Sequence, residues 1–462
     1  TVGEALREAK VRYLRHTGIH SLTPYDEKVL SELTLYGLPM VRPEFPGKLP
    51  AVSLAWLTKS AAGDRVDREI LTGDAGLIAQ RLSLALPVTS MTLPHGSYFA
   101  VDEEVAVVAG MPLQPKTTVS VTLEGEAAKA AFFEGGHYTV YPSFDPVVSR
   151  LVTDTSTGFV EPAYGFAEWV PAAWDVVNGL GTGEGLEQNL VVLPAQYRAV
   201  SEVTGTLRVF DQMTYTVYYS DAADLLPPSV WMVQDTVLAG QQAITVEVTD
   251  RAGVTRVAVV YTRGDGWWRT MDLTQSREDP DIWQGTLPYT ETLVYFVQAL
   301  DGAGNVGVEV NKAWYFYRPP TTAHLTPEEP DGVQGWYRQP VTVQLEGGNA
   351  QLEAGSTHFQ IEGGGWRTYT LPFEVEEGIV AVDYYSTHPL GSAAPVKSLT
   401  VQVDTQPPTT TASVMRASAS EWYTSTMEVH LTAEDGASGV LETHYRLDDS
   451  AWLVYTQTLR VD

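Results

Sequence analysis

The chain has 462 residues, of which 44% are apolar and 19% charged, and 57 acidic side chains against 29 basic ones give a formal net charge of −28. This composition excludes a wholly disordered chain, and at roughly 150 residues a domain the length predicts about three domains. The acidic balance excludes nucleic acid as a partner and argues against anionic lipid surfaces, because both recruit Lys and Arg.

The sequence contains no cysteine. Disulfides, thiolate metal sites, iron–sulfur clusters and a cysteine nucleophile are therefore excluded within this chain, and no cofactor is required. The apolar runs are shorter than the roughly 20 residues of a membrane helix, so no membrane-spanning segment is expected. Because the chain begins at Thr1 without Met, we interpret it as a piece of a longer precursor.

Helical patterning dominates residues 1–42. Thr1 and Glu4 fit a capping box, and apolar residues then recur at helical spacing. A second helix is predicted over Tyr25–Leu33 and a short buried strand over 35–40. These 42 residues bury too little surface to fold alone, so we interpret them as the C-terminal helix and strand of an α/β domain.

Residues 43–228 are predicted to be a β-rich region of one or two modules. Alternating apolar and polar residues predict strands at Val119–Leu123, Asn189–Leu193 and Thr214–Tyr219. One helix is predicted over Ala75–Leu84.

The pair Pro227-Pro228 marks a linker, after which residues 229–318 are predicted to form an Ig-like β-sandwich. Strands with strict alternation, such as the one around Ile244, are separated by tight turns at Asp250–Gly253 and Asp301–Asn305. No disulfide joins the sheets, so packing alone must hold them together.

Residues 319–406 and 407–462 are predicted to be two copies of one Ig-like repeat, since several motifs recur exactly 86 residues apart. The second copy lacks a counterpart of about 29 residues that close the first, so we interpret it as truncated. We expect residues beyond 462, or a strand from another molecule, to complete it. The recurring pairs are Trp336 and Trp422, Val341 and Met427, Thr357 and Thr443, Trp366 and Trp452, and Tyr369 and Tyr455.

The fold class predicted for the whole chain is therefore mainly β, with tandem Ig-like sandwiches after a β-rich region and a short α/β tail at the N-terminus. In that tail, Thr1-Val-Gly-Glu-Ala-Leu-Arg-Glu-Ala-Lys10 and Thr34-Leu-Tyr-Gly-Leu-Pro39 resemble the end of a gingipain-like cysteine peptidase domain, with Leu38 in place of the family's Asp. The resemblance implies a caspase-like fold for residues 1–42. The family's catalytic Cys and His lie upstream of this helix, so no catalytic residue carries over.

The later modules resemble Ig-like modules of large secreted bacterial proteins, in the Pro-Pro-Thr-Thr openings and the stretch from Tyr445 to Trp452. This resemblance implies a secreted, extracellular or cell-surface location. The function we infer is a non-catalytic segment whose modules space, display or attach a parent peptidase. Its expected partners are other modules of the same precursor or cell-surface components. The alternative is a structural or adhesive subunit that self-assembles, and a third is an unrecognised activity in residues 43–228.

Calcium is the one metal for which the sequence offers candidate ligands. Five oxygen-bearing residues lie in Gly-containing turns near the predicted module ends, where ligands can converge. The alternative is that each Asp caps its own turn without a metal. The candidates are Asp250, Asp301, Asn305, Glu434 and Asp435.

Four tryptophans of the repeat, Trp336, Trp366, Trp422 and Trp452, recur in step with the strands. This recurrence predicts that they pack in the cores, and Trp336 is expected to be largely buried. The alternative is an exposed aromatic platform that binds carbohydrate.

Overall fold

The computed structural model describes residues 65–72, 77–108, 110–149, 164–182, 185–201, 203–347, 355–388, 392–415 and 426–461. These residues are mainly β and form antiparallel sheets, as predicted. The described ranges include two short 3-10 helices, Asn311–Ala313 and Val333–Gly335, but no α-helix and no helix able to cross a membrane. The α/β tail predicted for residues 1–42 lies outside the described residues.

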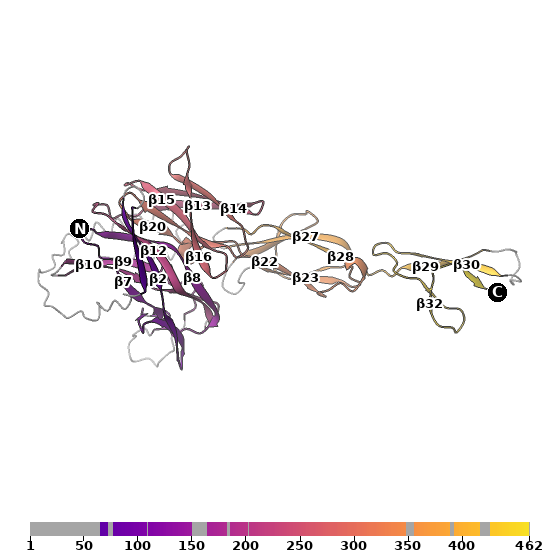
Figure 1. The fold of residues 1–462 in the computed structure, drawn as a ribbon. Helices are drawn as coiled ribbons and strands as arrows, with labels where there is room; N and C mark the ends of the chain where they lie inside the picture. The colour runs from indigo at the N-terminus through magenta and orange to yellow at the C-terminus, as the bar shows by residue number, and fades with distance from the viewer. Residues whose placement is uncertain are drawn as a thin grey trace.

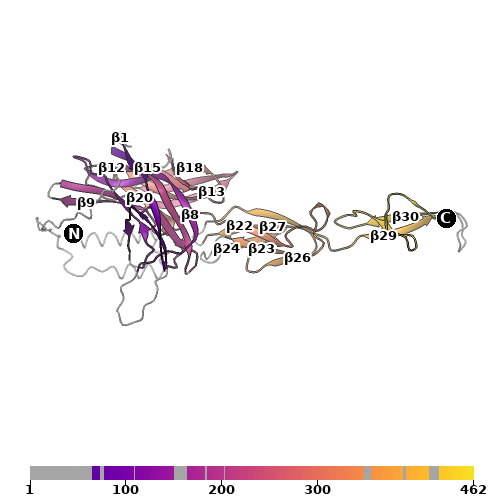
Figure 2. The same ribbon diagram turned by 60° about the horizontal axis from the view of Figure 1, so that its bottom comes forward.

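The described chain has three parts in space. A broad body, coloured indigo to pink in Figure 1, is followed by an orange module and then a yellow one in single file. The view in Figure 2 shows the same linear order, so the two modules extend away from the body rather than folding back onto it.

The body is built on one sheet of ten strands, in the order β1-β2-β12-β8-β16-β15-β19-β20, with β11 beside β12 and β21 beside β19. Its central strands β8 and β12 are the longest in the described chain, with 17 and 15 residues. The strands are β1 (Val66–Thr72), β2 (Ile78–Ala85), β8 (Ala128–Phe144), β11 (Ala195–Ala199), β12 (Gly205–Tyr219), β15 (Val254–Thr262), β16 (Trp267–Asp272), β19 (Val294–Asp301), β20 (Val306–Glu309) and β21 (Phe316–Tyr317).

Strand β2 corrects the helix predicted over Ala75–Leu84. It pairs with β1 on one side and β12 on the other, and Leu82 and Leu84 point into the core while Arg81 and Ser83 point outward. The sequence therefore alternates with a period of two, which fits a strand better than the helical spacing we inferred.

Smaller sheets surround the ten-stranded one. Strands β7, β10 and β9 form a three-stranded sheet, and β3 with β4 and β5 with β6 form two hairpin-like pairs. Their bounds are β3 (Val88–Leu93), β4 (Gly96–Val101), β5 (Val105–Ala106), β6 (Gln114–Pro115), β7 (Thr117–Ser120), β9 (Asp175–Thr182) and β10 (Gly185–Val192).

Residues 229–318 form two sheets packed face to face, as predicted for a sandwich. One sheet has the order β13-β14-β18-β17, and buried residues such as Ile244 and Val246 pack against Val257 and Val297 of the other. The bounds of the first sheet are β13 (Ser229–Leu238), β14 (Gln241–Thr249), β17 (Thr274–Gln275) and β18 (Ile282–Pro288).

The second sheet of this sandwich is continuous with the body. Strand β16 pairs with β8, so that Trp268 lies opposite Gly136 and Arg269 opposite Gly135. The far face of β15 and β19 is consequently buried as well, and Trp268 and Phe296 join the upstream aromatic core around Trp174. The linker at 227–228 thus separates two regions that share a sheet.

The first repeat, residues 319–406, packs two sheets around Val341, Val343, Val382 and Val401. One sheet has the order β22-β23-β26 and the other β25-β24-β27-β28. The strands are β22 (Thr321–Thr326), β23 (Val341–Gly347), β24 (Ser356–Ile361), β25 (Arg367–Thr368), β26 (Phe373–Val375), β27 (Gly378–Thr387) and β28 (Lys397–Val403).

The final module repeats this plan in the predicted register. Strands β32 and β33 lie 86 residues after β25 and β26, and β31 matches the middle of β24. The bounds are β29 (Thr409–Met415), β30 (Met427–Glu434), β31 (His444–Tyr445), β32 (Leu453–Val454) and β33 (Leu459–Val461).

The tryptophans of the repeat divide into two groups. Trp336 is buried at 7% exposure, which confirms the prediction for it. Trp366 and Trp452 are 42% and 63% exposed, so the prediction that they pack in the core is wrong. Each directly precedes a two-residue strand, β25 or β32, at the edge of its sheet. Trp422 lies outside the described residues.

Candidate functional site

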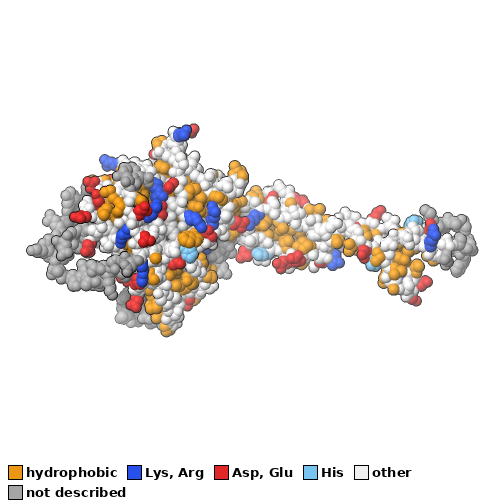
Figure 3. Space-filling model, viewed as in Figure 1, with side chains coloured by type: hydrophobic (Ala, Val, Ile, Leu, Met, Phe, Trp, Pro, Cys, Tyr) orange, Lys and Arg blue, Asp and Glu red, His pale blue; other side chains and the backbone are white. Residues whose placement is uncertain are grey.

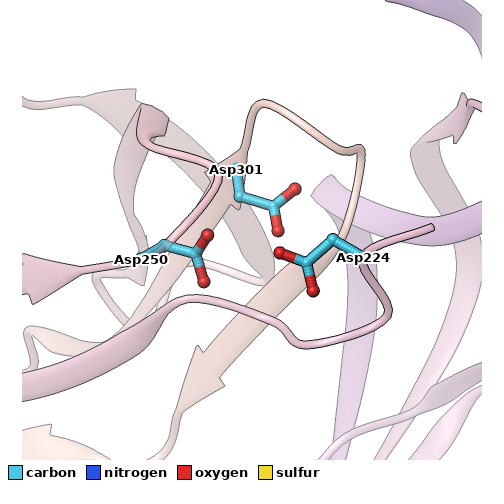
Figure 4. Close-up of side chains that lie close together, drawn as sticks. All are labelled: Asp224, Asp250 and Asp301. Atoms are coloured by element: carbon cyan, nitrogen blue, oxygen red, sulfur yellow. The ribbon is translucent and has the colours of Figure 1, made fainter. Parts of the chain in front are cut away.

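Three aspartates converge inside the body, where the sandwich of residues 229–318 meets the strands that precede it. Asp301 ends β19 and is fully buried, Asp250 directly follows β14, and Asp224 lies in the connection before β13. Figure 4 shows the three carboxylates pointing toward one another, with one oxygen of each within 4.8 Å of those of the other two.

Backbone hydrogen bonds hold each carboxylate in place. Asp301 Oδ1 accepts the N–H groups of Ala303 and Asn305, both at 2.8 Å, and Asn305 Nδ2 donates to Asp301 Oδ2 at 2.8 Å. Asp250 Oδ1 accepts the N–H of Ala252 at 2.6 Å. These contacts are those of aspartates that cap tight turns, so the turns are satisfied by the chain itself.

The connection that carries Asp224 is tied to the same turns. Asp224 Oδ1 accepts the N–H of Leu226 at 3.0 Å, while the backbone oxygen of Asp224 accepts from Lys129 Nζ and Asn305 Nδ2, both at 3.3 Å. The ammonium group of Lys129 therefore sits beside the connection and offsets part of its negative charge.

Chemically, the cluster offers hard oxygen donors of the kind that Ca²⁺ takes, three carboxylates toward a usual set of about 6–8 oxygens. Of the predicted ligands, Asp250, Asp301 and Asn305 come together as expected from their turns. In Asn305 it is the Nδ2 donor that points to Asp301. Calcium at this place stays a prediction, because turn capping accounts for the same geometry.

Sequence reasoning missed Asp224, although a signal was present. Asp224-Leu-Leu-Pro-Pro228 and Asp404-Thr-Gln-Pro-Pro408 share the pattern Asp-x-x-Pro-Pro, each immediately before a new module. In both cases the linker places this Asp beside turns of the module that follows.

Glu434 and Asp435 lie far along the chain, in the last module, and take no part in the three-aspartate cluster. Glu434 is exposed at the end of β30, and Asp435 Oδ1 accepts the N–H groups of Ala437 and Gly439 at 3.0 and 2.8 Å. Asp404 reaches the same turn and accepts the N–H of Ser438 at 2.8 Å, which holds the pKa of Asp404 below its usual value.

A cavity of about 400 Å³ lies beside the sheet of β7, β10 and β9. Its wall is mostly apolar, with Val107, Val191 and Leu193, and it carries two charged residues, Lys116 and Asp175. Burial raises the pKa of Asp175 to about 7, since desolvation disfavours the carboxylate. The cavity is thus an apolar hollow with one carboxyl group that titrates near neutral pH.

The sequence matches no protein-family model and no curated protein. Among solved structures, it is similar to the complex of Porphyromonas gingivalis RgpB pro- and mature domains, with 14% identity and a TM-score of 0.26 over 35% of this chain and 86% of that chain. It is also similar to the fibronectin(III)-like modules of Clostridium thermocellum CbhA, with 14% identity and a TM-score of 0.17 over 37% of this chain and 95% of that chain. A third is a tetra-tandem repeat in the extending region of a large adhesion protein, with 13% identity and a TM-score of 0.16 over 75% of this chain and 81% of that chain.

Proposed function

We propose that this chain is a non-catalytic spacer and display segment of a secreted bacterial protein, whose modules hold the rest of that protein at a fixed distance from the cell surface. The observation that supports this role most strongly is the single-file arrangement of the modules in Figure 1, together with the side-chain contacts that hold the two linkers between them. A flexible tether would lack such contacts, because they restrict the angle between neighbouring modules.

Charged and aromatic side chains hold the junction at 318–320 in place. Arg318 forms an ion pair with Asp235 of the body at 2.9 Å and donates to the backbone oxygen of Ala393 in the next module. Lys397 of that module forms an ion pair with Glu291 of the body at 2.7 Å. The bond from Arg318 to Ala393 and the ion pair of Lys397 with Glu291 cross the junction, so bending it breaks both of them, and the ion pair with Asp235 holds Arg318 in position.

Ring contacts reinforce the same junction. His388 of the first repeat is buried at 3% exposure, and the rings of Trp314 and Tyr317 lie edge-on to it at centroid distances of 5.5 and 4.8 Å. Such aromatic contacts add to the ion pairs.

The next junction, at 404–408, is held by hydrogen bonds. Asp404 N donates to Tyr337 O at 2.9 Å, and the side chain of Asp404 accepts from Ser438 of the last module. Thr405 Oγ1 donates to Glu377 Oε2 at 2.6 Å. Both linkers therefore have defined paths.

The parent protein that we propose is a gingipain-like cysteine peptidase, on the strength of the sequence pattern in residues 1–42. This chain contains no cysteine and so contributes no thiol nucleophile. Its contribution would be the position and exposure of the catalytic domain.

Deletion of residues 319–461 from the natural protein in its own bacterium tests the role. We expect the shortened protein to lose accessibility to antibody on intact cells or to be released into the medium, with its total amount unchanged. Unchanged surface labelling would contradict the proposal. Loss of an extracellular filament instead would favour the alternative, a structural or adhesive subunit.

A further inference from the structure

The outer face of the sheet β25-β24-β27-β28 in the first repeat carries a cluster of aromatic rings beside a row of polar side chains. Alternation along the strands places Phe359, Val382 and Tyr384 in the core and leaves the other set of residues on the outside. The outward set is Ser356, His358, Gln360, Trp366, Thr368, Ile379, Ala381, Asp383, Tyr385, Thr387, Ser398, Thr400 and Gln402.

The aromatic part is held in a defined arrangement. The rings of His358 and Tyr385, opposite each other on β24 and β27, stack with centroids 5.1 Å apart. The indole of Trp366 meets Tyr385 edge-on at 4.7 Å and remains 42% exposed. Because neighbouring rings restrict these side chains before anything binds, a ligand would lose little side-chain entropy in docking on them.

The polar part lies immediately beside the rings. Asp383 accepts hydrogen bonds from Gln360 at 2.9 Å and from Ser398 at 2.5 Å. These bonds hold the pKa of Asp383 below its usual value, so the carboxylate stays ionised and keeps lone pairs for further donors. The face thus presents flat apolar rings next to fixed hydrogen-bond acceptors.

The charges of this face and of the whole chain argue against an anionic ligand. Asp383 is the one acidic residue of the outward set, which contains no Lys or Arg, and the whole chain has a net charge of −28. On the face of the molecule drawn in Figure 3, basic side chains gather mainly on the body rather than along the modules. An anionic polymer would be repelled, whereas a neutral chain of hydroxyl groups and C–H faces would match both parts of this surface.

The same tryptophan recurs in the last module. Trp452 lies 86 residues after Trp366 and is 63% exposed, with the guanidinium group of Arg446 at 5.3 Å from its ring. Two exposed tryptophans on consecutive modules in single file can contact one extended polymer at two points, which raises the overall affinity.

We propose that the outer aromatic face of the first repeat, with Trp366 at its centre and Trp452 as a second contact, binds a neutral polysaccharide. This inference does not depend on the display role, because a spacer without glycan binding and a glycan-binding module without a spacer role are both self-consistent.

Affinity electrophoresis of the full chain tests the proposal, with galactomannan, xyloglucan or mixed-linkage β-glucan in the gel and polygalacturonate as the anionic control. We expect at least one neutral polysaccharide to retard the chain and polygalacturonate to leave it unretarded. Trp366→Ala should raise the Kd about tenfold or more, as expected for a tryptophan at the centre of a contact. Trp366→Ala combined with Trp452→Ala should abolish retardation.

Trp231→Ala is the matched control, because Trp231 is similarly exposed at 45% but lies on β13 of the body. It should bind as the unaltered chain does. Failure of all three neutral polysaccharides to retard the chain, or equal retardation of the Trp366→Ala variant, would overturn the proposal. Self-association in sedimentation velocity that disappears with Trp366→Ala would also overturn it, since a second copy would then be the occupant.

Discussion

At the residue scale, Trp336 shows how one side chain supports a module that has no disulfide. Its indole is 7% exposed, next to Tyr337, whose backbone N–H and C=O pair with Gln402 and Asp404. Trp336→Ala should destabilise the first repeat by about 3–5 kcal/mol, the usual range for truncation of a core aromatic. Trp366→Ala, at an exposed position, serves as the control. Calorimetry of the full chain should show a lower melting temperature for the first variant only, and equal melting temperatures would contradict the burial.

Asp175 links one residue to the pH dependence of stability. Burial raises the pKa of Asp175 to about 7 in the folded chain, above the value of 3.8 that the carboxyl group has in an unfolded chain. The folded state therefore holds its proton more tightly, and stability falls as pH rises from about 4 to 7. Asp175→Asn should have little effect at about pH 4 and should raise the melting temperature at about pH 8. Equal effects at the two pH values would contradict the raised pKa.

At the element scale, the decisive contact is the pairing of β16 with β8, which joins the sandwich to the body. Gly135 has φ +145°, and a Cβ built there would lie 2.5 Å from the backbone oxygen of Trp268. Gly135→Ala should therefore destabilise the body by roughly 2 kcal/mol or more, since backbone atoms must shift. Gly165→Ala, with open space around it, is the control. Equal urea midpoints for the two variants would contradict a close β8–β16 approach.

The calcium prediction concerns the turns that bring the three aspartates together. If Ca²⁺ binds among Asp224, Asp250 and Asp301, adding roughly 1–5 mM Ca²⁺ should raise the melting temperature of the chelator-treated chain by mass action. Asp301→Asn should remove that increase, and Glu434→Gln, outside the cluster, should keep it. No change in the melting temperature of the unaltered chain would leave turn capping as the whole explanation.

The sequence predicted the elements that depend on residues close together in the chain, but it did not predict contacts between residues far apart in the chain. Strict alternation predicted β14, and the 86-residue register predicted the matching strands of the two repeats. The fused sheet was missed because Trp268 and Gly136, which pair in it, are 132 positions apart in the sequence, and no local pattern encodes such a contact. Among the site residues, Asp250 and Asp301 followed from their turns, whereas Asp224 depended on the path of a linker. The exposure of Trp366 was not predicted, because it results from the position of this residue next to a short strand at the edge of a sheet.

At the scale of the whole molecule, we infer that the body and the two modules form a rod in which the junctions between them are fixed. The absence of cysteine allows two introduced cysteines to be spin-labelled uniquely. Exposed threonines suited to this are Thr286 on β18 and Thr400 on β28, one on each side of the junction at Arg318.

Double electron–electron resonance between labels at Thr286→Cys and Thr400→Cys measures the distribution of distances across that junction. We expect one narrow distribution, which broadens when Arg318→Ala removes the ion pair with Asp235 and the bond to Ala393. A broad distribution in the chain with Arg318 intact would show modules that swing freely, and would contradict the fixed spacer.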